Sequence, residues 1–199
     1  MKKLFILSIM IVTAAASYAQ DFKKDVAAAK TAYNAGKLED AHFALQQTLV
    51  QMDITIGKEV LKLLPEKMDT LKVNATEDNV NGNVSFVGAT IHRSYGMGPK
   101  KTEVEIVNNS PLLGTLNAFL TSPFLAKMGG DGNSKVLKVQ GYKGRLTKEQ
   151  NMDGNAPSYK FEIPLSNALI TIDAANSSES EIVAFANSLP MDKIAKLIQ

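Results

Sequence analysis

The sequence contains no cysteine and no tryptophan, and only 7% of its 199 residues are aromatic. Without cysteine, the chain cannot form a disulfide framework, a cysteine-ligated zinc site, an iron–sulfur cluster or a thiol nucleophile. The chain also has little excess charge of either sign, because its 22 Lys+Arg nearly balance its 20 Asp+Glu. This near balance, together with the few aromatics, argues against nucleic acid as a partner. A hydrophobic content of 45% is that of a folded globular chain.

The first residues have the features of a secretory signal. Two lysines precede an apolar run over residues 4–12, and Ser17 and Ala19 then fit the small-x-small rule for cleavage after Ala19. The alternative is an N-terminal membrane anchor, but the run is far shorter than the 20 or so residues of a span. The sequence therefore predicts a signal peptide over residues 1–19 and a periplasmic or secreted product.

Removal of this segment would change the charge of the protein. Lys2 and Lys3 account for the formal net charge of +2, since the segment holds no acidic residue. The product from Gln20 onward has 20 basic and 20 acidic residues, so no net charge draws it to nucleic acid or to an anionic membrane. No later segment has the length of a membrane span, and we expect none after cleavage.

Residues 20–64 are predicted to form a helical hairpin. Phe22, Val26, Ala29 and Tyr33 recur at helical spacing, and Gly36 is suited to end that helix. A second apolar stripe follows at the same spacing, and it comprises Leu38, Ala41, Leu45, Leu49, Met52, Ile56 and Val60. Pro65 is expected to stop the second helix, and residues 54–57 are a stretch where it could bend.

The turn of this hairpin resembles the middle of a tetratricopeptide repeat. The resemblance rests on residues 33–41, which read Tyr-Asn-Ala-Gly-Lys-Leu-Glu-Asp-Ala, and on Leu45. A repeat of that family implies a peptide-binding groove, but it needs stacked neighbours and the chain has no second copy. We therefore expect a plain αα-hairpin, with Tyr33, Leu38 and Leu45 as its candidate partner surface.

From residue 71 onward the apolar period changes from 3.6 to 2, which indicates strands. Residues 102–106 and 159–163 alternate apolar with charged side chains, and residues 90–95, with 84–87, supply a further strand. Residues 136–139 and 169–172 are continuously apolar, which is typical of central strands. The links between them are expected to be turns, and they cover residues 78–83, 96–99 and 153–155.

Helices are predicted between and after these strands. Ser110 and Pro111 can start an inserted helix, whose apolar positions include Leu112, Leu116, Phe119 and Leu120. Residues 178–181, Ser-Glu-Ser-Glu, form a capping box that opens a C-terminal helix, and Pro190 breaks that helix before a last turn. The predicted fold class is α+β: an αα-hairpin, then a mainly antiparallel sheet with the inserted and C-terminal helices packed on one face.

The α+β domain predicted over residues 65–199 is similar, over about residues 60–199, to a group of exported bacterial (Bacteroidetes-like) proteins with PsbP-like α+β domains. The similarity rests on four short motifs: Leu64-Pro65, Asn109-Ser110-Pro111, Gly141-Tyr142-Lys143-Gly144 and the helical run over residues 191–197. It departs from the group at Leu71, where a tryptophan is usual. The resemblance implies a fold and an exported location, and it implies no reaction or cofactor.

Two functions fit these observations. The first is a non-catalytic module that binds another protein of the cell envelope, with the amphipathic hairpin as one contact surface. The alternative is a carrier of a small apolar ligand, held in a cleft between the inserted helix and the sheet. The candidate cleft residues are Leu112, Leu116, Phe119, Phe124 and Met128. No cofactor is expected.

Polar residues give no clear catalytic or metal site. His42 and His92 are the only histidines; His42 is expected to be partly exposed or satisfied, and His92 has no nearby aspartate or cysteine for a triad or a zinc site. Asn151, Asp153, Asn155 and Glu162 match offsets 1, 3, 5 and 12 of a calcium loop, whose required glycine is replaced by alanine. We expect a turn there, and whether calcium binds near Asp153 is left open.

One further motif concerns modification. Residues 69–71, Asp-Thr-Leu, resemble the short O-glycosylation signal of exported Bacteroidetes proteins. The resemblance implies that Thr70 is the modified residue.

Overall fold

The computed structural model of the chain describes residues 22–83, 85, 88–122, 133–149 and 157–198. The chain divides into two compact units, the first ending at Met52 and the second beginning at Asp53. The predicted hairpin of residues 20–64 is therefore shared between the units. The predicted signal peptide lies outside the described residues. Among the described helices, none is long and apolar enough to cross a membrane.

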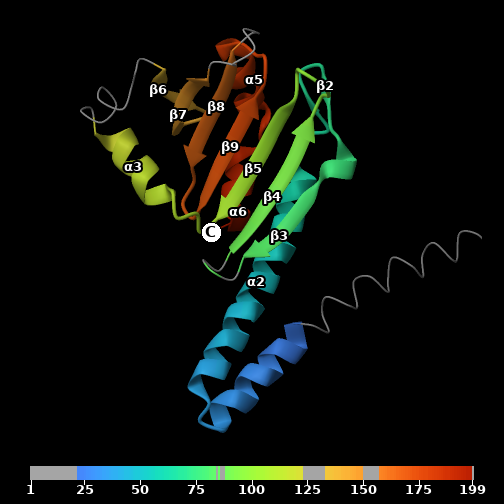
Figure 1. Cartoon of the computed structure of the whole chain (residues 1–199), viewed down its shortest axis with the longest axis vertical. Coiled ribbons are helices and arrows are strands. Elements are labelled where there is room, and N and C mark those ends of the chain that lie inside the picture. Colours follow the sequence, from blue (N-terminus) through green and yellow to red (C-terminus); the bar gives the residue numbers. More distant parts are fainter. Residues whose placement is uncertain (1–21, 84, 86–87, 123–132, 150–156, 199) are drawn as a thin grey trace, which may run out of the picture. The chain divides into compact units, whose positions relative to one another are not determined.

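The first unit contains one helix and the first part of a second, joined by a short turn (Figure 1). Helix 22–34 ends before Gly36, whose φ of 71° is the left-handed conformation that glycine adopts at helix C-termini. The second helix, α2 (Leu38–Leu63), begins two residues later and ends just before Pro65, as predicted. It is one continuous α-helix through residues 54–57, where a break was possible.

The second unit is built on a seven-stranded sheet with the order β3-β4-β5-β9-β8-β7-β6. All neighbouring pairs are antiparallel. The strands are β3 (Asn79–Asn83), β4 (Gly88–Tyr95), β5 (Thr102–Asn108), β6 (Ser134–Val139), β7 (Tyr142–Glu149), β8 (Ser158–Pro164) and β9 (Ala168–Ala174). A small hairpin of β1 (Lys67–Met68) and β2 (Leu71–Lys72) precedes them. The predicted fold class, α+β with an antiparallel sheet, is confirmed.

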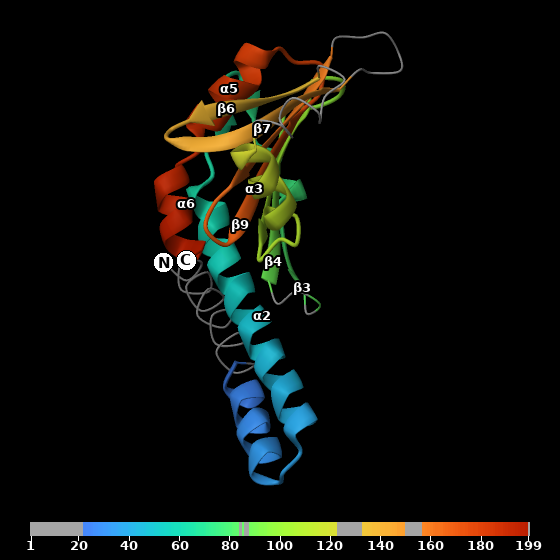
Figure 2. The same cartoon turned by 90° about the vertical axis from the view of Figure 1, so that its left-hand side faces the viewer.

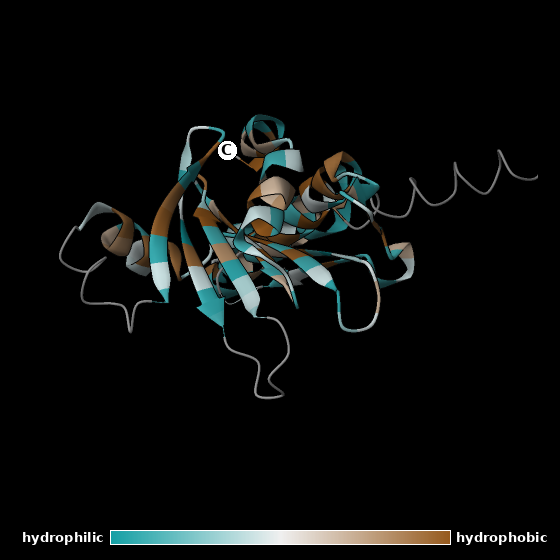
Figure 3. Cartoon of the chain, turned by 90° about the horizontal axis from the view of Figure 1, so that it is seen from above, coloured by the Kyte–Doolittle hydropathy of each residue, from teal (hydrophilic) through white to brown (hydrophobic). Residues whose placement is uncertain are grey.

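One face of the sheet forms the hydrophobic core. Apolar and polar residues alternate along the strands (Figure 3), and the apolar side meets α5 (Glu179–Ser188), α6 (Met191–Ile198) and the C-terminal part of α2. Ile170, Ile172 and Phe161 are fully buried there. The Ser178 hydroxyl accepts a hydrogen bond from the Glu181 N–H, and the Glu181 carboxylate accepts one from the Ser178 N–H, so the predicted capping box is confirmed.

The inserted helix α3 (Leu113–Thr121) lies on the other face (Figure 2). Its Phe119 ring packs against Arg145 of β7, whereas the next residue, Leu146, points into the core. We expected this helix on the same face as the C-terminal helices, and its placement differs from that expectation. The helix also begins later than predicted, because Pro111 and Leu112 form a turn in which the Leu112 N–H donates to the Ser110 hydroxyl.

Two predictions about strands need correction, and one further strand was missed. Residues 78–83 were expected to be a turn, but β3 pairs there with β4, and Val80 lies opposite Ile91. The apolar run 136–139 suggested a central strand, yet β6 is the edge of the sheet, where its two lysines suit an exposed edge. Strand β7 was not predicted. The expected strand over 84–87 and the expected turn over 153–155 lie at least partly outside the described residues.

Candidate functional site

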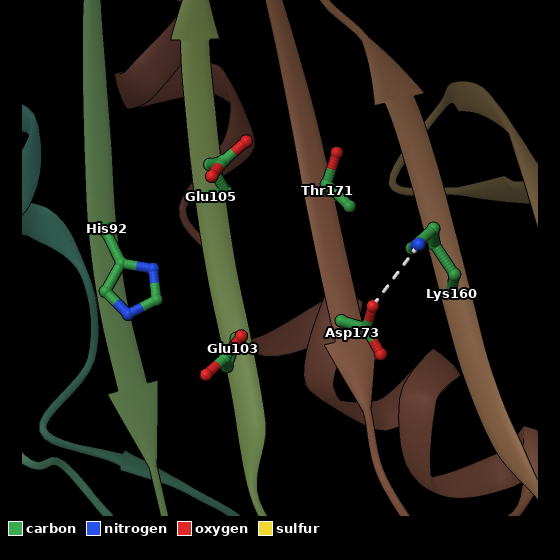
Figure 4. Close-up of a pocket in the computed structure, with 6 residues that line it drawn as sticks. All are labelled: His92, Glu103, Glu105, Lys160, Thr171 and Asp173. Carbon is green, nitrogen blue, oxygen red and sulfur yellow. Dashed lines mark ion pairs between the residues drawn. The ribbon is translucent and has the colours of Figure 1, made fainter. Parts of the chain in front are cut away.

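The face of the sheet opposite the core carries a polar surface. His92 of β4 lies beside Glu105 of β5, and Glu105 lies beside Thr171 of β9. One pleat further along, Glu103 pairs with Asp173, which in turn pairs with Lys160 of β8. These six residues line an open depression of about 220 Å³, and Figure 4 shows their side chains on one face of the strands. Strand register alone brings them together, because they come from four strands.

Most charged groups on this face are already paired. Lys160 Nζ lies 3.5 Å from the Asp173 carboxylate and 3.4 Å from that of Glu149. Lys101 Nζ lies 2.9 Å from Glu77 and 2.8 Å from Glu103. The surface therefore balances its own charge across neighbouring strands.

Burial and neighbouring charges shift the pKa values of Asp173 and Lys160. Burial raises the pKa of Asp173, and the neighbouring Glu149 and Glu103 add to this while Lys160 opposes it. Burial lowers the pKa of Lys160, but Asp173 and Glu149 outweigh it, so the net pKa is raised. Lys160 is therefore held in its charged form at neutral pH.

On the polar face, strand register places one histidine, His92, beside one carboxylate, Glu105. His92 lies across from Glu105, but neither side chain forms a hydrogen bond or an ion pair within the described part of the chain. No group of three or more histidine, aspartate or glutamate residues within the described ranges could hold a metal ion. What these groups can do chemically is to exchange hydrogen bonds with a polar ligand or with water.

The predicted apolar cleft is not assembled by the described residues. Leu116 and Phe119 are 2% and 7% exposed and fill the contact between α3 and the sheet. Leu112, by contrast, is 57% exposed. Phe124 and Met128 lie outside the described residues. Of the three predicted cleft residues that the structure describes, two are therefore buried under α3 and one lies on the surface.

Arg145 explains how α3 is held on a polar face. Its guanidinium carbon lies 5.4 Å from the centre of the Phe119 ring, and its Nη2 lies 2.7 Å from Glu162 Oε2. The Glu162 residue is only 8% exposed, so this ion pair is largely shielded. Glu162 is the described member of the predicted calcium set, and its carboxylate is occupied by Arg145; the other three members lie outside the described residues.

The predicted partner surface on the hairpin is exposed. Tyr33, Leu38 and Leu45 are 67%, 63% and 52% exposed. Four more large hydrophobic side chains of the first unit are also exposed, namely Val26, Phe43, Leu49 and Met52. Outside the first unit, the exposed large hydrophobic side chains among the described residues are Met97, Leu112 and Leu197. The exposed apolar side chains are therefore concentrated in the hairpin.

The two helices of the hairpin meet through small residues, so the large apolar side chains are not needed in their contact. Ala29 of helix 22–34 and Ala41 and Thr48 of α2 are the buried residues on the face where the two helices meet. Leu49 and Met52 belong to the predicted apolar stripe and are exposed, like the predicted partner residues Leu38 and Leu45. Only its second part, at Ile56 and Val60, packs with the core of the second unit.

The remaining sequence candidates lie on the surface. Thr70 is exposed in the two-residue turn between β1 and β2, next to Asp69 with a φ of 52°. Its hydroxyl is therefore accessible at the tip of a hairpin. His42 is exposed on α2, one position from Phe43.

Comparisons with known proteins add no relative. The chain matches no protein-family model, and neither the curated proteins nor the solved structures contain a match.

Proposed function

We propose that the protein is a non-catalytic, exported module that binds another protein of the cell envelope through its helical hairpin. One observation carries this proposal: seven of the ten large hydrophobic side chains that are exposed among the described residues lie between Val26 and Met52. An exposed apolar cluster of this kind marks an interaction surface more often than scattered single residues do.

The energetics favour a partner for this surface. Full burial of a large apolar side chain contributes roughly 1.5–3 kcal/mol. The hairpin does not obtain this contribution from its own contact, which buries small side chains. A partner that covers several of the seven side chains would supply it.

The polar face of the sheet supports the non-catalytic part of the proposal. Three of its carboxylates, at Glu103, Asp173 and Glu162, are engaged by lysine or arginine, which leaves Glu105 beside His92. A general base or nucleophile would need a carboxylate or histidine aligned with a reacting group. The predicted signal peptide and the resemblance to exported PsbP-like domains support a location in the periplasm or outside the cell.

The experiment is affinity capture from the cell-envelope fraction of the native host. The wild-type chain is compared with Leu45→Glu/Leu49→Glu, which places two charges on the hairpin surface. Met97→Glu is the matched control, because Met97 is 82% exposed in a turn outside the hairpin. We expect a defined partner to be captured by the wild type and the control and lost with the double variant. Identical captured proteins for all three chains would contradict the proposal.

A further inference from the structure

The exposed apolar residues of the hairpin lie on one side of it, which follows from the phase of each helix. In helix 22–34 the more buried positions are Phe22, Asp25, Ala29 and Ala32, and they define the direction of α2. At about 100° per residue, Val26 and Tyr33 are turned roughly 70° from that direction. They therefore form a stripe along one flank of the contact between the helices.

The second helix has a stripe of its own. Its more buried positions toward helix 22–34 are Ala41, Ala44, Thr48 and Gln51. At about 100° per residue, the middle of the exposed stripe is turned about 90° from the direction of helix 22–34. These exposed positions are Leu38, Leu45, Leu49 and Met52.

The two stripes face the same way. Both helices are right-handed, and they run antiparallel through a short turn (Figure 1). Viewed from one end, successive residues therefore advance clockwise around one helix and counterclockwise around the other. Each stripe is turned by a similar angle, in the direction of increasing residue number, from the side that contacts the other helix. The two stripes therefore lie on the same side of the hairpin. We name this surface the apolar face of the hairpin; it comprises Val26, Tyr33, Leu38, Leu45, Leu49 and Met52. Phe43 points to a different side.

Two adjacent helices with neighbouring apolar stripes form a surface suited to one more helix. A third helix can lie over the line between them at the usual 8–10 Å axis separation, with its own apolar stripe against both. Leu38, Leu45 and Met52 are spaced seven residues apart, which is the repeat that packs against another helix in coiled coils.

The charges beside the apolar face determine which flank of such a helix must be acidic. Lys23 and Lys30 lie seven residues apart and border the face on its helix 22–34 side. Both are exposed, and neither has an ion pair within the described residues. By contrast, Lys62, Lys100 and Lys135 of the second unit each lie within 2.7 Å of a carboxylate oxygen.

The border on the α2 side carries no lysine or arginine. Within the first unit, the positions that follow the stripe there include Glu39, His42 and Gln46, so only the helix 22–34 side of the face is cationic. We propose that the apolar face binds one amphipathic helix of a partner protein, and that this helix carries acidic residues on the flank toward Lys23 and Lys30. The inference rests on the proposed function and names the kind of partner that the same surface takes.

The test uses two synthetic helical peptides as probes, with the chain from residue 20 onward. Each peptide has leucines at the first and fourth positions of about three heptads. One peptide has glutamates along a single flank, and the other has lysines at those positions. Affinities are measured by titration calorimetry at low salt, because the contribution of exposed charges is screened by salt.

We expect the glutamate peptide to bind at least about tenfold more tightly than the lysine peptide. Lys23→Glu/Lys30→Glu should reverse that order, and Leu45→Glu/Leu49→Glu should abolish binding of both peptides. Lys24→Glu is the matched control, since Lys24 points to the opposite side of the helix and should leave the order unchanged.

Several results would overturn the inference. Equal affinity for both peptides, or no binding of either, would refute the acidic helix. Binding to phosphatidylglycerol vesicles that depends on Lys23 and Lys30, without peptide binding, would assign the face to a membrane surface. Concentration-dependent self-association lost with Leu45→Glu/Leu49→Glu would assign it to a second copy of the chain. Successful capture of a partner without peptide binding would refute this inference and leave the proposed function standing.

Discussion

The hairpin and the sheet unit differ in which side chains they leave in water. In the hairpin, alanine, threonine and one valine, Val50, are buried, while seven large apolar side chains are exposed. In the sheet unit, most large apolar residues are buried, and most charged residues of the exposed face form ion pairs. The sheet unit therefore satisfies most of its own surface, whereas the hairpin leaves a cluster of large apolar side chains exposed. This contrast separates the part that provides stability from the part available for binding.

The largest expected effect tests the sheet unit. Phe161 is fully buried between the sheet and its helices, so Phe161→Ala would remove contacts and leave a cavity. We expect a loss of about 3–5 kcal/mol in the free energy of unfolding, measured by urea denaturation. A loss below about 1 kcal/mol would contradict the tight packing assigned to this core.

A smaller effect is expected at a close backbone contact. A Cβ at Gly144 would lie 2.6 Å from the Glu162 carbonyl oxygen, so Gly144→Ala should lower the free energy of unfolding by about 1–3 kcal/mol. Gly114 in α3 is the matched control, because nothing lies within 4 Å of its Cβ position. Gly114→Ala should stabilise by about 0.4–1 kcal/mol in the same measurement. Equal effects would refute the close contact.

Acid titration tests the pairing at the end of the sheet unit. Lys100, the Ser178 N–H and the Ser178 hydroxyl hold the pKa of Glu181 at about 2, well below its ordinary value of 4.5. A lowered carboxyl pKa contributes stability above pH 4.5, and that contribution is lost as the pH falls toward 2. The stability difference between the wild type and Glu181→Gln should therefore shrink over that range. A difference independent of pH would contradict the pairing.

The smallest effect is expected in the hairpin. Leu49 is half exposed, so Leu49→Ala should change the free energy of unfolding by less than about 0.5 kcal/mol. The same substitution should weaken partner binding, because Leu49 lies on the apolar face. A stability loss comparable to that of Phe161→Ala would show that Leu49 is packed within the chain, and would remove it from the binding surface.

Local patterns predicted most of the fold. The capping box at Ser178 and the glycine after helix 22–34 are decided within a few residues, so the sequence was sufficient for both. Strand β3 was missed because its asparagines and glycine favour turns, while its pairing with Ile91 of β4 comes from elsewhere in the chain. The edge position of β6 also depends on its partner strand and not on its own apolar run.

The sites were predictable only in part. Helical spacing identified Leu38 and Leu45, but spacing cannot tell which part of a stripe finds a partner within the chain. The second part of the stripe, at Ile56 and Val60, does find one. The cluster of His92, Glu105 and Thr171 escaped prediction because it depends on the register of three strands, which no local pattern specifies.

The central claim is that the apolar face of the hairpin is occupied by a partner in the cell. The most direct test places a photo-crosslinking amino acid at position 45, on that face, and at position 27, on the outer side of helix 22–34. We predict one defined crosslinked product at position 45 and none at position 27 when the protein is irradiated in its native host. The same products at both positions, or none at either, would contradict the account.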